Sequence, residues 1–268
     1  MVTHTKKLNQ AHCTVKVSVI TICHNSEHFI ADTIRSVLSQ TYPEIEYIVV
    51  DGNSQDNTLE IIKSFGTRIS KWVSEPDKGL YDALNKGLAM ATGEIVGFLH
   101  SDDIFANETV IETMADFFTN PGLDSVYGDI QYVDQNDIHK TLTNRKSGKF
   151  SRTKLRFGWL PPHPTFYVRR KLYNEYGNFD TTFDIAADYD SILRFLVKHK
   201  ISTTYIPMVM VKMRVGGVSN RTMHNISRKW KEDYRAMKKN NFGNVFTLFF
   251  KTMRPIAHFY KSPKYLFN

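Results

Sequence analysis

Two adjacent carboxylates, Asp102 and Asp103, follow the apolar run EIVGFL (residues 94–99) after two intervening residues. Two such charges repel each other unless a cation or hydrogen-bond donors compensate them. Carboxylates that act together with substrate phosphates are suitable ligands for Mg²⁺ or Mn²⁺. The pair therefore indicates a divalent-cation site. The alternative is a helix N-terminus, where an aspartate is favoured by the helix dipole.

Three further aspartates lie next to apolar segments. Asp51 ends the run IEYIVV, and a carboxylate there can accept a hydrogen bond from a ribose hydroxyl or a base N–H. Its alternative role is that of a turn aspartate before Gly52. Asp188 and Asp190 open a helical apolar pattern. By residue type alone, both are helix-start residues.

The elements that position these groups alternate between strands and helices. Apolar and β-branched runs predict four strands, at 16–23, 45–50, 69–73 and 94–99. Helices are predicted between and after them, at 26–40, 58–65 and 80–91. This alternation is typical of an α/β fold with a parallel sheet covered on both faces, whose ligand crevice lies beyond the carboxyl ends of the strands. The polar clusters of the sequence fall at those ends.

After residue 106 the pattern changes. A helix is predicted at 107–118, and short strands at 124–127, 130–133 and 138–143, the last two forming a hairpin. A strand at 165–168, a helix at 188–200 and a strand at 203–214 follow. The remainder begins with a basic helix at 221–240.

Several well-known binding motifs are missing from the sequence. The first strand is followed by CHNSEHF and not by a G-x-G-x-x-G turn, and there is no G-x-x-x-x-G-K-[ST] segment. There is also no G-x-S-x-G or H-E-x-x-H motif, and the two cysteines lack zinc-site spacing. A nucleotide would therefore have to be bound through carboxylates and a metal ion.

Composition and charge exclude several other classes of protein. The chain has 268 residues, with 41% hydrophobic and 23% charged residues, as in soluble globular proteins. It lacks a membrane-spanning apolar run and a signal peptide pattern, and we expect the two cysteines to be reduced cytosolic thiols. Residues 221–268 hold 11 Lys/Arg against 2 Asp/Glu, whereas residues 1–220 are nearly neutral.

Two long stretches carry a specific resemblance. VSVITICHNSEHFIADTIRSVLSQTYPEIEYIVVDGNSQDNT and SEPDKGLYDALNKGLAMATGEIVGFLHSDD resemble family 2 glycosyltransferases of the GT-A fold, particularly bacterial enzymes that assemble exopolysaccharide, capsule or O-antigen. The resemblance covers residues 16–215. It implies a GT-A domain at 1–220 with a mostly parallel sheet, a nucleotide-sugar half at 16–105 and an acceptor half at 106–220. It also implies inverting, metal-dependent transfer from a nucleotide-diphosphate sugar.

The resemblance assigns roles in donor binding. Thr21 and Asn25 would lie beside the nucleotide, and Asp51 would bind the base or ribose. A second group would line the donor phosphates and ribose, namely Asp77, Gly79 and Asn85. In the segment that matches the DxD motif, Ser101-Asp102-Asp103, Asp103 would bind the metal and Asp102 would lie beside the donor. The motif's first position is serine here.

The resemblance also assigns roles in the second half. Ala187-Asp188 matches the family's E-D motif, so Asp188 would be the catalytic base, although alanine replaces the usual glutamate. His163 matches a segment near the acceptor pocket, or is a rigid structural element between prolines. Arg214 would recognise the diphosphate. His100 is expected to pack at a strand end.

The segment 221–268 combines basic residues with six of the 18 phenylalanines. Such a segment can lie on an anionic membrane surface. Packing on the domain and binding to nucleic acid are the alternatives. Since the acceptors of these enzymes are usually polyprenyl-diphosphate-linked, the membrane is favoured over nucleic acid. The expected location is the inner face of the cytoplasmic membrane.

Two other functions are alternatives to glycosyl transfer. A sugar nucleotidyltransferase shares the sheet and the metal, but it normally has a glycine-rich basic loop after the first strand, which CHNSEHF lacks. A non-enzymatic membrane-binding or nucleic-acid-binding module would not need Asp51, Asp102, Asp103 and Asp188 together.

Overall fold

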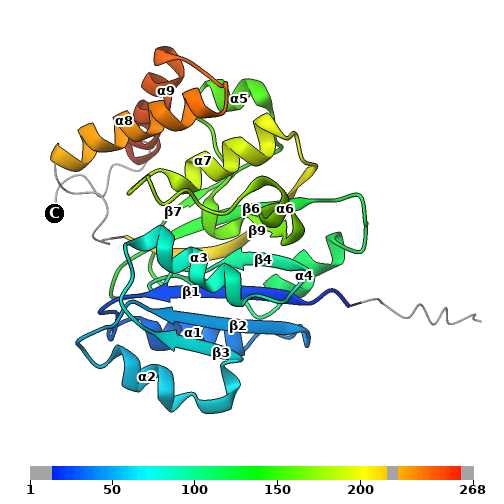
Figure 1. The fold of residues 1–268 in the computed structure, drawn as a ribbon, viewed down its shortest axis with the longest axis vertical. Helices are drawn as coiled ribbons and strands as arrows, with labels where there is room; N and C mark the ends of the chain where they lie inside the picture. Colours follow the sequence, from blue (N-terminus) through cyan, green and yellow to red (C-terminus); the bar gives the residue numbers. More distant parts are fainter. Residues whose placement is uncertain (1–13, 216–222, 261–268) are drawn as a thin grey trace, which may run out of the picture.

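The computed structural model describes residues 14–215 and 223–260, with side chains for 14–215 and 227–253. Its first half contains four parallel strands in the order β3-β2-β1-β4 (Figure 1). They are β1 (Val17–Cys23), β2 (Ile45–Asp51), β3 (Lys71–Ser74) and β4 (Ile95–Phe98). The predicted parallel arrangement of these strands is confirmed.

Alternate residues of these strands face two different helical layers. Ile20, Ile48 and Phe98 belong to one hydrophobic cluster together with α3 (Leu80–Met90). The other face packs on α1 (Ile30–Leu38) and α2 (Thr58–Ser64) in a second cluster. Because side chains alternate across a strand, continuous apolar runs are needed to fill both layers.

The second half extends the sheet with mixed pairing, in the order β4-β8-β6-β9-β5, with β7 on β6. Only β6 and β9 are parallel there, whereas the pairs β4–β8, β6–β8, β6–β7 and β5–β9 are antiparallel. The mostly parallel pattern thus holds for the first half of the sheet. The strands are β5 (Ile104–Phe105), β6 (Ser125–Val133), β7 (Thr141–Arg145), β8 (Tyr167–Arg169) and β9 (Thr203–Arg214).

Short helices connect these strands. Two of them concern the site: α5 (Arg152–Arg156), which precedes the turn η2 (His163–Thr165), and α7 (Ala187–Leu193), which continues into the π-helical turn η3 (Arg194–Lys198). The others are α4 (Val110–Phe117), α6 (Lys171–Tyr176) and the turn η1 (Gly66–Arg68).

Two C-terminal helices, α8 (Met223–Lys239) and α9 (Val245–Tyr260), lie against α7 and α5 at the upper end of Figure 1. The Glu232 carboxylate of α8 accepts backbone hydrogen bonds from residues 184, 185 and 186, just before α7. Ala236, Met237 and Phe242 join the hydrophobic cluster of the acceptor half. The described part of the predicted tail therefore packs on the domain, while residues 221–222 and 261–268 lie outside the described residues. Of the described helices, none is long and apolar enough to cross a membrane.

Candidate active site

The ends of the three strands β1, β2 and β3 meet at one edge, where Asp51 aligns with Cys23 and Ser74. The Asp51 side chain is fully buried. Its Oδ2 accepts hydrogen bonds from the Ser54 amide at 3.1 Å and from the Ser74 hydroxyl at 2.6 Å, and Oδ1 accepts one from the Ser54 hydroxyl. Asp51 thus lies at the predicted edge, held in one orientation by two serines.

Two glycines shape the adjoining loop around Asp77. Asp77 Oδ1 accepts a hydrogen bond from the Gly79 amide at 2.9 Å, and Gly79 has φ +119°, a conformation that suits glycine. A Cβ added to Gly52 would lie 2.4 Å from Asp77 Oδ2. The absence of a side chain at Gly52 therefore lets the Asp77 carboxylate reach the Asp51 strand end. The Asp-Gly pair at 51–52 is the sequence signal for this close approach.

Three other donor-side predictions, Thr21, Asn25 and Asn85, have different surroundings. Asn25 is exposed in a left-handed conformation (φ 48°) and accepts a hydrogen bond from the Gln55 amide at 2.8 Å, so it lies at the crevice edge. The Thr21 side chain is buried and accepts a hydrogen bond from Tyr47. The Asn85 amide bonds both backbone groups of Phe179, at 2.9 and 3.0 Å. These two side chains hold the fold together, and their roles in donor binding stay predictions.

Asp102 and Asp103 follow β4 but differ in their environment. Asp102 is half-buried, whereas Asp103 is 2% exposed. Burial and the neighbouring Asp102 charge raise the pKa of Asp103 well above its ordinary value, although Arg214 opposes this. Asp103 Oδ2 is buried and has no hydrogen-bond partner among the described residues. A carboxylate oxygen in that state favours either a proton or a cation.

The carboxylate oxygens of Asp102 and Asp103 are chemically suited to bind a divalent cation. An orphaned buried carboxylate oxygen on Asp103, with a second carboxylate on the adjacent residue, matches the oxygen ligands that Mg²⁺ and Mn²⁺ prefer. No group of three or more His, Cys, Asp or Glu side chains able to hold a metal occurs in the described part of the chain. A cation bound here would therefore complete its coordination with donor phosphates and water.

Arg214 anchors this segment from the end of β9. It donates to the Asp102 carbonyl oxygen at 2.9 Å and to Asp32 Oδ2 at 2.8 Å, and its guanidinium lies 4.9 Å from the centre of the Phe29 ring. Its side chain is only 5% exposed. Arg214 thus lies beside the predicted donor segment, where it fixes the Asp102 backbone. Its predicted contact with the diphosphate stays a prediction.

Asp188 lies at the start of α7, facing α3. Its Oδ1 accepts hydrogen bonds from the Tyr189 amide at 2.7 Å and from the Tyr81 hydroxyl at 3.3 Å. Burial raises the pKa of Asp188, but His163, Lys229 and Lys251 together with the Tyr189 amide outweigh it, so the net pKa is lowered. A half-buried carboxylate that stays ionised is suited to accept a proton.

Two histidines, His100 and His163, lie between the carboxylates of the donor half and those of the acceptor half. The ring centres of His100 and His163 are 6.0 Å apart, and His163 stacks on Phe98 at 5.5 Å. Burial lowers the pKa of His163 to about 4, and it also lowers that of His100, against the opposing effect of Asp102 and Asp188. Both rings are therefore neutral at pH 7. His100 was expected only to pack at a strand end. The charges of both Asp102 and Asp188 act on its pKa, so it lies between the two halves of the site.

The C-terminal helices supply site residues that sequence reasoning missed. Lys251 of α9 is 14% exposed, pairs with the buried Asp233 of α8 and lies 4.0 Å from the centre of the Tyr189 ring. Lys229 of α8 adds a second positive charge near Asp188. Basic residues in an appended segment carry no local motif, so only the packing of α8 and α9 could reveal this role.

The family model described as "Glycosyl transferase family 2" matches residues 18–183. The chain belongs to this family. An uncharacterized glycosyltransferase of Mycobacterium tuberculosis is 32% identical over 194 residues, covering 66% of this chain and 68% of that protein. The UDP-Glc:alpha-D-GlcNAc-diphosphoundecaprenol beta-1,3-glucosyltransferase WfgD of Escherichia coli is 30% identical over 224 residues, covering 80% and 83%.

Solved structures share the fold of this glycosyltransferase. The mannosyltransferase PcManGT of Pyrobaculum calidifontis, in complex with GDP-Man and Mn²⁺, has a TM-score of 0.63 at 19% identity and covers 93% of this chain and 72% of its own. S. aureus TarS 1–349 in complex with UDP has a TM-score of 0.63 at 20% identity, covering 84% and 65%. This chain spans 39% of the longer TarS chain. The predicted GT-A fold is confirmed.

Proposed function

We propose that this glycosyltransferase inverts the anomeric centre as it moves a sugar from a nucleoside-diphosphate sugar to a hydroxyl of a lipid-diphosphate-linked saccharide. The observation that carries the proposal is the meeting of an ionised Asp188 with the Asp102–Asp103 segment across His100 and His163. Asp188 suits a proton acceptor, and the Asp102–Asp103 pair suits a divalent cation that would bind the donor diphosphate. The separation of the two roles is what a single displacement requires.

In the proposed reaction, the acceptor hydroxyl attacks the anomeric carbon from the face opposite the diphosphate. The hydroxyl proton passes to Asp188 as the new C–O bond forms, and the bond from the anomeric carbon to the diphosphate oxygen breaks. The nucleoside diphosphate leaves with the bonding electron pair. Asp188 then returns its proton to solvent. The Tyr81 hydroxyl and the Tyr189 amide hold the Asp188 carboxylate in place throughout.

The donor side is proposed to be bound by the strand-end groups. Asp51 would accept hydrogen bonds from the base or ribose, and the Asp77–Gly79 loop would lie along the ribose and phosphates. Asp103, together with Asp102, would hold Mg²⁺ or Mn²⁺, which supplies positive charge to the departing diphosphate. Thr21, Asn25 and Asn85 complete the proposed donor site with Arg214, as the resemblance implies.

The acceptor class rests on the similarity to WfgD, whose name states a diphosphoundecaprenol-linked acceptor. His163 would face this acceptor. A role in cell-surface polysaccharide synthesis at the inner face of the cytoplasmic membrane follows from such an acceptor. The donor class is supported by the fold shared with proteins that were solved with UDP and with GDP-Man.

The experiment offers a panel of UDP-, GDP- and dTDP-sugars with Mn²⁺ and synthetic lipid-diphosphate-linked sugars. We expect one donor to release nucleoside diphosphate only when an acceptor is present, and to yield a lengthened glycolipid by mass spectrometry. Release of inorganic pyrophosphate from sugar phosphate and nucleoside triphosphate would instead identify a nucleotidyltransferase. Release of neither product across the panel would contradict the proposal.

A further inference from the structure

The outer side of α9 exposes a row of large hydrophobic side chains. Phe246 is 74% exposed and Phe249 is 56% exposed, far above what a soluble helix normally leaves in water. Phe157, at the end of α5, is 54% exposed and makes an edge contact with Phe250 at 5.2 Å between ring centres. We call this set the apolar ridge: Phe157, Val245, Phe246, Phe249, Phe250 and Met253.

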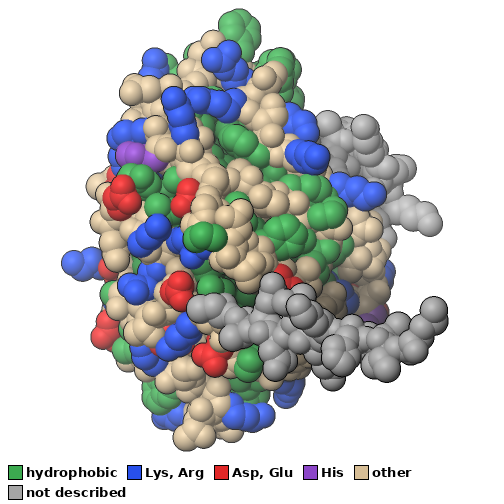
Figure 2. Space-filling view, turned by 90° about the vertical axis from the view of Figure 1, so that its right-hand side faces the viewer, with side chains coloured by type: hydrophobic (Ala, Val, Ile, Leu, Met, Phe, Trp, Pro, Cys, Tyr) green, Lys and Arg blue, Asp and Glu red, His purple; other side chains and the backbone are tan. Residues whose placement is uncertain are grey.

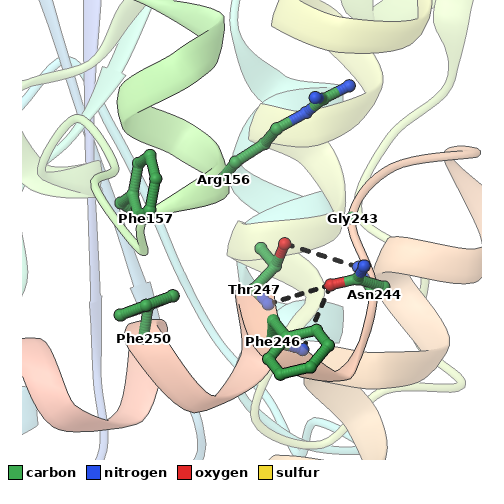
Figure 3. A pocket seen from close by; sticks show the side chains of 7 residues that line it. All are labelled: Arg156, Phe157, Gly243, Asn244, Phe246, Thr247 and Phe250. Atoms are coloured by element: carbon green, nitrogen blue, oxygen red, sulfur yellow. Dashed lines mark hydrogen bonds between the residues drawn. The ribbon is translucent and has the colours of Figure 1, made fainter.

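The apolar ridge sits on firmly packed helices. A Cβ on Gly158 would lie 2.4 Å from the Lys251 Cα, so α5 and α9 approach as closely as a glycine permits. Asn244 Oδ1 accepts hydrogen bonds from the amides of Phe246 and Thr247 and so caps the start of α9. Arg156, Phe157 and the start of α9 line a pocket of about 340 Å³. Figure 3 shows these residues, with the Arg156 side chain extending away from Phe246 and Phe250.

A basic segment from the body of the protein borders the apolar ridge. Residues 145–156 contain six Lys/Arg and no Asp/Glu. Five of these side chains are exposed and form what we call the basic collar: Lys146, Lys149, Arg152, Lys154 and Arg156. In Figure 2, Lys and Arg side chains surround hydrophobic ones at the upper end of the molecule, where Figure 1 places α5 and α9.

We propose that the apolar ridge and the basic collar together dock this protein on the surface of an anionic lipid bilayer. Positive charge attracts the protein to anionic headgroups, and inserted aromatic side chains add affinity that salt does not screen. A protein partner is a weaker match for this surface, because exposed aromatic side chains next to a segment of exposed Lys and Arg complement a surface that is both apolar and negative. The docking surface differs from the sequence expectation, since half of it comes from residues 145–157.

The docking orientation connects the bilayer to the reaction. On the opposite side of α9 from the apolar ridge, Lys251 covers the Tyr189 ring next to Asp188. A bilayer under the ridge would therefore bring the base and its acceptor hydroxyl near the headgroup level. The link between docking and the reaction rests on the proposed lipid-linked acceptor, whereas the docking itself does not.

The test is co-sedimentation of the full chain with vesicles of phosphatidylcholine alone or with 30% phosphatidylglycerol. Phe246→Ser/Phe249→Ser removes two exposed ridge side chains, and Lys149→Glu/Arg152→Glu reverses two collar charges. Trp72→Ser, which removes a comparably exposed aromatic side chain from β3, is the matched control. We expect wild type and the Trp72 variant to bind anionic vesicles alike, and the ridge and collar variants to bind at least tenfold more weakly with unchanged melting temperatures.

Equal binding of the ridge variant and wild type at equal melting temperatures would overturn the proposal. So would light scattering that shows a wild-type dimer which the ridge variant converts to a monomer, because the occupant would then be a second copy. Turnover on a short soluble acceptor is measured in parallel and is expected to be unaffected by ridge or collar changes. If no donor is turned over but the vesicle result holds, the docking inference survives and the proposed function fails.

Discussion

Asp188 and Asp190 stand two residues apart at the start of one helix, yet the structure gives them different surroundings. Asp188 is half-buried and accepts a hydrogen bond from Tyr81, whereas the Asp190 side chain is fully buried. Asp190 Oδ2 pairs with Arg194 at 2.9 Å, and Oδ1 accepts a hydrogen bond from Asn240 at 2.8 Å. Substitution by asparagine at each position should therefore separate catalysis from stability.

The expected magnitudes follow from these contacts. Asp188→Asn keeps an oxygen that can accept from Tyr81 and Tyr189, so its stability cost should be about 1 kcal/mol or less. Loss of a general base lowers turnover by about 10²–10⁴-fold. Asp190→Asn leaves the buried Arg194 charge unpaired at a cost of about 3 kcal/mol or more. For a chain of this size, about 3 kcal/mol lowers the melting temperature by roughly 6–12 °C.

The assay pairs thermal unfolding with nucleoside diphosphate release at saturating donor and with donor binding by calorimetry. We expect Asp188→Asn to bind donor as wild type does but to turn it over at least a hundredfold more slowly, and Asp190→Asn to unfold early while the folded fraction retains activity. An active Asp188→Asn beside a stable but inactive Asp190→Asn would refute the reasoning and move the base to Asp190.

Three other predictions concern the donor side and the ionisation of the base. Asp103→Asn removes a carboxyl group whose pKa burial raises, so the free energy that this group costs the fold grows as the pH rises above the ordinary aspartate pKa of about 4 and reaches its full size only above the raised pKa. The melting temperature of metal-free Asp103→Asn should therefore exceed that of metal-free wild type at pH 7–8, and the further rise that Mn²⁺ with nucleoside diphosphate gives wild type should vanish. Gly52→Ala should displace the Asp77 carboxylate and raise the donor KM about tenfold with little change in kcat, and an unchanged KM would contradict this contact. Lys229→Gln should raise the pKa of Asp188 and move the acid limb of the kcat profile to higher pH, whereas the exposed control Lys231→Gln should leave it in place.

Much of the fold could be predicted from local patterns. The strand predicted at 203–214 coincides with β9, and α3 ends one residue before its predicted end at 91. Long periodic segments between clear turn residues define such elements. The helix predicted from residue 26 begins only at Ile30, because Ser26 is used in a turn and its hydroxyl bonds to Ser101 and the His24 carbonyl.

The second half of the fold was harder to predict from the sequence, because its geometry depends on partners that are distant in sequence. The segment 124–133 was predicted as two strands, at 124–127 and 130–133. It forms one strand, β6, with a register shift at that point, and a Cβ on Gly128 would lie 2.5 Å from Met210 Sδ. The glycine thus serves close packing against β9, which no local pattern could show.

The candidate site was predictable only in part for the same reason. Asp51, Asp102, Asp103 and Asp188 could be named because each stands at a strand end or helix start. Tyr81 lies within the helix predicted at 80–91 and was not predicted as a site residue, and its hydroxyl contact with Asp188 links residues 107 positions apart. Lys251 lies even further from the motifs. Such contacts arise from tertiary packing and carry no sequence spacing of their own.

The stereochemistry of transfer tests the central claim most directly. Proton NMR of the reaction as it proceeds, with the donor that the panel identifies, reports the anomeric configuration of the first product formed. An α-linked nucleotide sugar should give a β-linked product, and Asp188→Asn should form none at the wild-type rate. An α-linked first product would contradict a single displacement assisted by Asp188.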